Sequence, residues 1–137
     1  MANPTSYDPV FTVVPSIGIT TLAAATTPIT SRLNITGTTG LTQLCPVSTA
    51  GKRIDVITIR GLAVTAAGIV FIWLNDGTTS RVIDEFPITV VAASNTVEGF
   101  SLAHTYTTLI LPATYSLYCS LTVANDLSIR ADGADFT

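Results

Sequence analysis

Few side chains in this 137-residue sequence have the chemistry of a catalytic centre. His104 is the only histidine, so it is the only general base near neutral pH for a nucleophile such as Cys119. It lies in phase with Leu102 and Tyr106 in an alternating segment, which is typical of a half-buried structural histidine in a strand. We therefore expect no nucleophilic triad.

The acidic residues are poorly spaced for catalysis or metal binding. Asp84 and Glu85 are adjacent, so in a strand they would point to opposite faces rather than across a cleft. Asp126, Asp132 and Asp135 offer oxygen ligands for Ca²⁺, but their spacing differs from an EF-hand loop and favours a solvated C-terminal turn. We expect no enzyme activity, no metal site and no cofactor.

Two pairs of residues have both a functional and a structural interpretation. Cys45 and Cys119 could form one disulfide, but Cys119 alternates with leucines, which favours two buried thiols. Phe71 and Trp73 would share one face of a strand, where core packing is favoured over a platform that stacks on sugars. Both pairs are therefore expected to stabilise the fold.

Charge is scarce in this chain, and its scarcity excludes several classes of protein. Only 11% of the residues are charged, with six basic and nine acidic side chains and a net charge of −3. Six cations neutralise few phosphates, so we expect no nucleic-acid binding. The longest apolar run, residues 61–74, is too short to span a bilayer, so we expect no membrane partner.

A surface covered by Thr, Ser, Asn and Ala suits permanent contact with other subunits, and we expect a homo-oligomer or a docked subunit of a larger array.

Hydrophobic residues recur with a period of two from residue 42 onward. In residues 115–123, Leu117, Cys119 and Leu121 alternate with hydroxyl-bearing side chains, which predicts a strand with one face in the core. The turn residues 75–77 (Asn-Asp-Gly) between two apolar segments indicate a hairpin. Turns roughly every 8–12 residues predict an all-β fold, a single antiparallel β-sandwich of about eight strands over residues 42–137.

Residues 1–41 differ in composition, because they are rich in Thr, Ala and Pro and poor in charge. Proline at this frequency prevents a long helix. We interpret this range as an extended N-terminal arm that is ordered where it meets a partner, while an ordinary first strand of the same sandwich fits equally well. The expected anchors of the arm at an oligomer or capsid interface are Tyr7, Phe11, Val13, Val14, Ile17 and Ile19.

Several stretches resemble small virion proteins of tailed bacteriophages. They are residues 51–60 (GKRIDVITIR), 68–78 (GIVFIWLNDGT), 81–88 (RVIDEFPI), 111–117 (LPATYSL) and 129–136 (IRADGADF). The resemblance is to capsid decoration (cement) proteins and head-fibre bases, and it covers roughly residues 42–137. It implies a jelly-roll-like sandwich, often trimeric, that binds the major capsid protein of an assembled phage shell and stabilises that shell. The implied location is the capsid surface of the virion, and the host cytoplasm during assembly.

Two other functions stay open at this point. The chain could be a structural component of a phage tail, baseplate or fibre, because such parts have the same need for weakly charged contact surfaces. It could also be a carbohydrate-binding β-sandwich that uses Trp73 or Tyr118.

Overall fold

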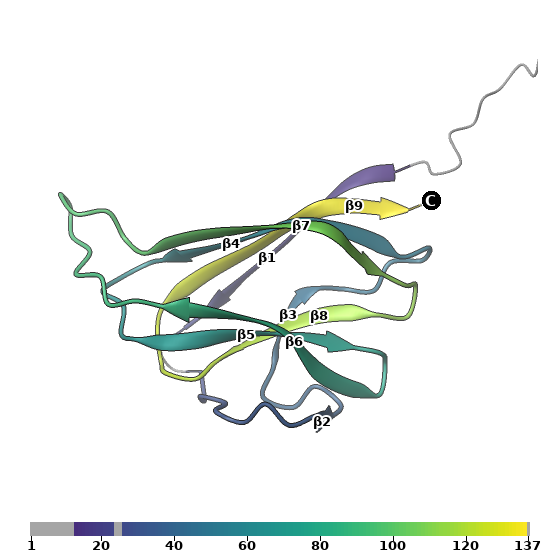
Figure 1. Ribbon diagram of the computed structural model, residues 1–137, viewed down its shortest axis with the longest axis horizontal. Coiled ribbons are helices and arrows are strands. Elements are labelled where there is room, and N and C mark those ends of the chain that lie inside the picture. Colours follow the sequence, from purple (N-terminus) through teal and green to yellow (C-terminus); the bar gives the residue numbers. More distant parts are fainter. Residues whose placement is uncertain (1–12, 24–25, 137) are drawn as a thin grey trace, which may run out of the picture.

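The computed structural model describes residues 13–23 and 26–136, which form two antiparallel sheets packed face to face (Figure 1). The four-stranded sheet contains, in spatial order, β1 (Val13–Leu22), β9 (Leu127–Phe136), β4 (Lys52–Gly61) and β7 (Ser101–Leu111). The five-stranded sheet contains β2 (Ile35–Thr36), β6 (Thr79–Ile88), β5 (Gly68–Asn75), β8 (Ser116–Leu121) and β3 (Thr42–Cys45). The predicted all-β antiparallel sandwich is confirmed.

The strands pair in a nested order. β1 pairs with β9, β3 with β8, β4 with β7 and β5 with β6, and every pair is antiparallel. The four pairs fold into two layers, in which β9 also pairs with β4 and β8 also pairs with β5. The order is compatible with the predicted jelly roll of eight strands. The described residues add one short strand, β2, at the edge beside β6.

The main core lies between the two sheets and follows the two-residue period of the sequence. Ile57 and Ile59 of β4 and Ile129 of β9 meet Ile72 of β5 and Leu117 of β8, and all five side chains are fully buried. Burying a side chain of this size contributes about 1.5–3 kcal/mol. The inward positions of both sheets therefore supply most of the stability of the sandwich.

The described part of the predicted arm, Val13–Leu22, is an edge strand of the four-stranded sheet. It pairs with β9 along all ten residues. This part of the chain is therefore an ordinary first strand of the sandwich, the alternative to an extended arm. Gly18 faces inward, where a Cβ atom would lie 2.2 Å from the carbonyl oxygen of Leu44. The missing side chain thus lets β1 pack closely against β3 and close this side of the sandwich. The division of the chain at residue 41 stays a prediction.

A second, smaller core lies on the outer face of the five-stranded sheet. Phe71 and Trp73 alternate with the inward-facing Val70 and Ile72, so they point away from the main core, yet both rings have no exposed surface. The two rings meet edge to face, with centroids 6.1 Å apart. The predicted core packing of these aromatic side chains is confirmed, although the core that buries them is a separate one.

Residues 26–41, which we call the strap, run across this outer face (Figure 1). The amide of Ile29 donates to the carbonyl oxygen of Leu121 at 2.8 Å. The guanidinium of Arg32 lies 5.1 Å from the centre of the Phe71 ring and pairs with the carboxylate of Glu85. The strap thus covers the aromatic pair, and it is also held to the sheet by the pairing of β2 with β6 and by the Gly37 amide, which donates to the Thr78 carbonyl oxygen at 2.6 Å.

Candidate functional site

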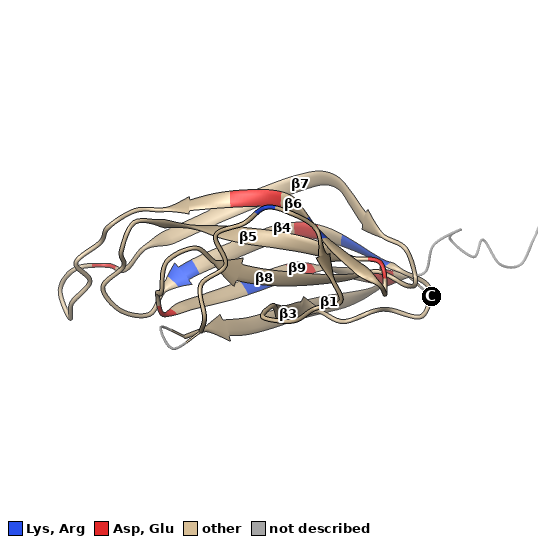
Figure 2. Ribbon diagram, turned by 90° about the horizontal axis from the view of Figure 1, so that it is seen from below, with Lys and Arg blue, Asp and Glu red and all other residues tan. Residues whose placement is uncertain are grey.

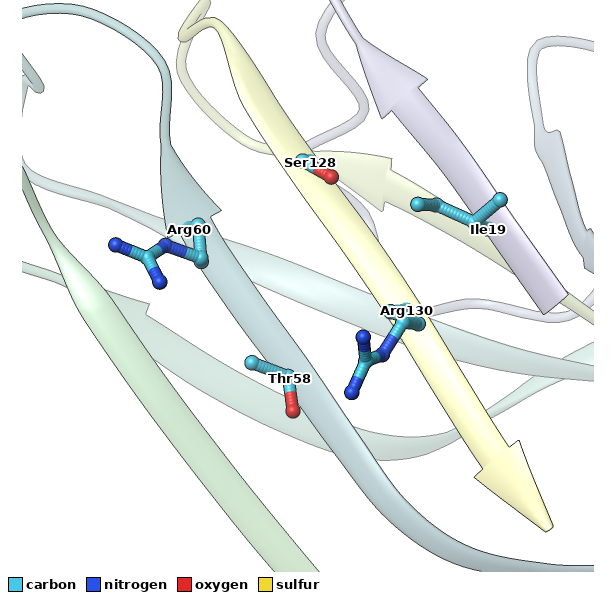
Figure 3. A pocket seen from close by; sticks show the side chains of 5 residues that line it. All are labelled: Ile19, Thr58, Arg60, Ser128 and Arg130. Atoms are coloured by element: carbon cyan, nitrogen blue, oxygen red, sulfur yellow. The ribbon is translucent and has the colours of Figure 1, made fainter. Parts of the chain in front are cut away.

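The outer face of the four-stranded sheet carries a hollow of about 190 Å³. Its lining residues are Ile19, Thr58, Arg60, Ser128 and Arg130 (Figure 3). Strand register brings them together, because Arg130 of β9 is opposite both Ile19 of β1 and Thr58 of β4, and Ser128 is opposite Arg60. Three strands that are distant in sequence therefore build one shallow site.

Positive charge is concentrated in this hollow, in a chain that has only six basic residues. Arg130 donates through Nε to Asp132 at 3.0 Å, so its terminal nitrogens are not used in that bond. Arg60 is exposed, and its side chain has no ionic or hydrogen-bonding partner among the described residues. The other four cations each pair with a carboxylate. Two guanidinium groups with free donors make the hollow suited to a carboxylate or another oxyanion.

Apolar side chains flank the hollow on β1. Ile17 and Ile19 point outward and are each 65% exposed. Val14, which is 51% exposed, lies at the far end of β1, opposite Asp135. Large aliphatic side chains side by side on a sheet face are typical of a surface that another molecule covers. Val13 lies at the start of β1, opposite Phe136.

The predicted anchors Tyr7 and Phe11 lie outside the described residues. The sequence reasoning missed Arg60 and Arg130, because only the register of β4 with β9 places them on one face. An alternating pattern shows which residues share the face of one strand, but it does not show which strands are neighbours.

A second cluster of titratable side chains joins β6 to β7. Tyr106 Oη donates to Asp84 Oδ2 at 2.7 Å, and His104 Nε2 lies 3.9 Å from the same oxygen. The His104 ring also packs against Phe86, with centroids 5.3 Å apart. Burial and the neighbouring carboxylate raise the pKa of Tyr106, so its phenol stays a hydrogen-bond donor. No hydroxyl or thiol of the described residues is hydrogen-bonded to His104, and its contacts are those of a structural side chain.

Asp84 and Glu85 point in opposite directions, as adjacent strand residues must. Asp84 faces Tyr106 and His104 of β7, whereas Glu85 pairs with Arg32 of the strap. The two carboxylates therefore do not share a cleft.

The acidic C-terminal segment is a strand rather than the solvated turn that its composition favours. Asp132 and Asp135 belong to β9, which pairs with β1 on one side and with β4 on the other. Asp132 pairs with Arg130, and Asp135 pairs with Lys52 at 3.4 Å. Within residues 13–23 and 26–136, no three His, Cys, Asp or Glu side chains group in a way that could hold a metal ion.

The two cysteines are buried and free. Burial raises the pKa of Cys45 to about 11 and that of Cys119 to about 12, and Cys119 Sγ donates to the Thr42 carbonyl oxygen at 3.5 Å. Because the thiolate is the reactive species, we expect neither thiol to react with iodoacetamide at mildly alkaline pH while the protein is folded. Intact mass spectrometry should show no adduct on the folded chain and two adducts after unfolding in guanidinium chloride. One adduct on the folded protein would contradict this.

Asp76 fixes the hairpin turn between β5 and β6. Its carboxylate accepts the amides of Thr79 at 2.8 Å and Thr78 at 2.9 Å, and the guanidinium of Arg81 at 2.9 Å. These bonds lower the pKa of Asp76 from its ordinary 3.8 to about 2. A carboxyl whose pKa is lower in the folded state stabilises the fold above the unfolded pKa, and this contribution is lost as the pH falls through the folded pKa.

An acid titration of Asp76→Asn checks this contribution. We expect the wild type to be more stable than this variant by a constant amount above about pH 4, and the difference to shrink as the pH falls toward about 2. Urea unfolding followed by circular dichroism at several pH values measures the difference. Asp55→Asn is the matched control, because the Asp55 carboxylate pairs with the Arg53 side chain and accepts no backbone amide among the described residues. A difference that is independent of pH would contradict the assignment.

No protein-family model, curated protein or solved structure matches this chain. In the part of the chain that the structure describes, no helix is long and apolar enough to cross a membrane.

Proposed function

We propose that this protein is a structural component of a bacteriophage particle, a capsid decoration (cement) protein that binds the assembled shell as an oligomer and stabilises it. Its partners would be further copies of itself, with a trimer favoured, and the major capsid protein. Its place would be the capsid surface of the virion, after synthesis in the host cytoplasm. The phage shell as partner comes from the resemblance of residues 51–60, 68–78 and 81–88 to virion proteins.

The observation that carries the proposal is the exposed apolar face of β1. Ile17 and Ile19 are each 65% exposed on β1, a strand that itself carries no charged residue (Figure 2). An interface that covers β1 has no charge of this strand to desolvate and gains from each isoleucine that it buries. β1 is also an edge strand, so a strand of a partner can add to it through main-chain hydrogen bonds.

Binding to shells tests the proposal. The purified full-length chain is mixed with undecorated shells of the phage whose genome encodes it. We expect saturable, stoichiometric binding and a higher melting temperature of the shell. Ile17→Ser with Ile19→Ser should weaken binding by at least tenfold and leave circular dichroism unchanged, because both side chains are exposed. Leu33→Ser, on the strap and 78% exposed, is the matched control. Folded wild-type protein that does not bind the shells would refute the proposal.

The two alternative functions make different predictions. A tail, baseplate or fibre component would give immunogold labelling confined to the tail of the particle. A carbohydrate-binding module would give specific hits on a glycan array. Of its two proposed contact residues, Trp73 is fully buried and Tyr118 is half-buried.

A further inference from the structure

Two opposite charges stay unbalanced among the described residues. Arg60 is the one basic residue without an acidic partner, as shown above. Glu98 is the one acidic residue there whose side chain has no ionic or hydrogen-bonding partner. The other carboxylates contact Arg, Lys or Tyr side chains, and Asp126 also has a partner. Within residues 13–23 and 26–136 every other charged residue already has a partner, so these two side chains are available for an external contact.

Glu98 lies in the loop of residues 89–100, which connects β6 to β7 and projects from one end of the sandwich (Figure 1). Hydrogen bonds hold the base of this loop, from the Gly61 amide to the Phe100 carbonyl oxygen at 2.7 Å and from the Thr65 amide to the Val91 carbonyl oxygen at 3.1 Å. A turn holds its tip, where the Ser94 amide donates to the Val97 carbonyl oxygen at 3.0 Å. Glu98 is exposed, and its neighbour Val97 is 49% exposed. The loop thus presents an apolar side chain beside a carboxylate.

The hollow combines an apolar wall with positive charge, which complement the apolar side chain and the carboxylate of the loop. Ile19 supplies an exposed apolar wall, and Arg60 and Arg130 supply guanidinium groups with free donors (Figure 3). We propose that the loop of a second copy of this chain occupies the hollow, with Val97 packed on Ile19 and the Glu98 carboxylate bound by Arg60 beside Arg130. The proposal refines the homo-oligomer that forms part of the proposed function. The second copy is favoured over another partner because this chain itself holds both complementary charges.

The contact joins two different surfaces, the loop of one copy and the hollow of another. Both lie at the same end of the sandwich, because Arg60 is opposite Ser101 and the Gly61 amide donates to the Phe100 carbonyl oxygen. Two copies can therefore exchange their loops reciprocally and close as a dimer, or each copy can contact the next and close as a ring. A trimer would be a ring of three such contacts.

Charge reversal tests the contact on the full chain, with the mass in solution measured by sedimentation or light scattering. Arg60→Glu places the carboxylate of Glu98 against another carboxylate, and Glu98→Arg places a third guanidinium in the hollow. Each single variant should raise the dissociation constant by on the order of tenfold or more. The double variant R60E/E98R restores opposite charges and should return close to the wild type. Arg53→Glu is the matched control on β4, because the partner of Arg53 is Asp55 of the same strand.

Mixing the two single variants distinguishes a contact between copies from one within a chain. The R60E hollow and the E98R loop carry opposite charges, so the mixture should form hetero-oligomers in native mass spectrometry although each variant alone dissociates. A wild type that is monomeric at its highest soluble concentration would overturn the contact. An oligomer indifferent to both reversals, or a mixture that does not associate, would overturn it too. A monomer that still binds shells would refute this contact and the oligomeric state in the proposed function, but not the decoration role. An oligomer with the expected charge dependence that ignores shells would refute the decoration role alone.

Discussion

Trp73→Ala is expected to lower the free energy of unfolding by about 3–5 kcal/mol, the range for deleting a buried aromatic side chain. The Trp73 ring has no exposed surface and packs edge to face against Phe71 beneath the strap. Removing it leaves a cavity on the outer face of the five-stranded sheet, and the strap loses the surface that it covers. Urea unfolding, followed by circular dichroism at equilibrium, measures the change.

Trp73→Phe is the matched control for this loss. It keeps an aromatic ring in place and removes the hydrogen bond from Trp73 Nε1 to Ser120 Oγ, which is 2.8 Å long. We expect a smaller cost, about 1–2 kcal/mol, for the lost bond and the smaller ring. If Trp73→Ala costs less than about 1 kcal/mol, the second core does not stabilise the fold and the strap is not held by it.

Asp135→Ala is expected to cost about 3 kcal/mol, because it leaves a buried ammonium group without its partner. The side chain of Lys52 is only 4% exposed, and its Nζ lies 3.4 Å from Asp135 Oδ1. The side chain of Asp135 is 37% exposed, so water reaches part of the pair and the expected cost lies at the lower end of the range for buried pairs. Chemical denaturation at neutral pH measures the loss.

The opposite deletion should behave differently. Lys52→Met removes the buried cation and keeps a side chain of similar length, while the partly exposed carboxylate of Asp135 can turn toward water. We expect a change within about 1 kcal/mol of the wild type, since replacing a buried charge by an apolar group is often neutral. A Lys52→Met variant that is less stable than Asp135→Ala would contradict this account of the pair.

Local sequence signals predicted the strands well, because period and turn chemistry are local properties. The turn at residues 75–77 forms the hairpin between β5 and β6, and Gly77 adopts the positive φ of 97° that a glycine there permits. Residues 132–135 show where local signals fail. Their composition favours a turn, but hydrogen bonding to strands on both sides outweighs that preference.

The candidate site depends on information that is not local. Ile17 and Ile19 were predicted as interface residues because they are apolar in a weakly charged segment, and the structure leaves both exposed. Arg60 and Arg130 meet only because β4 and β9 are neighbours, and an alternating pattern does not determine which strands are adjacent. The strap was missed because it has almost no regular structure and its role depends on the aromatic pair that it covers.

The antiparallel pairing of β1 with β9 has a practical consequence for engineering. Val13 is opposite Phe136, so the chain enters and leaves the described sandwich at one corner, while Ser128 and the hollow lie toward the other end of β9. An affinity tag or a displayed enzyme that is attached directly before Val13 or directly after Phe136 would therefore leave the sandwich from the same corner.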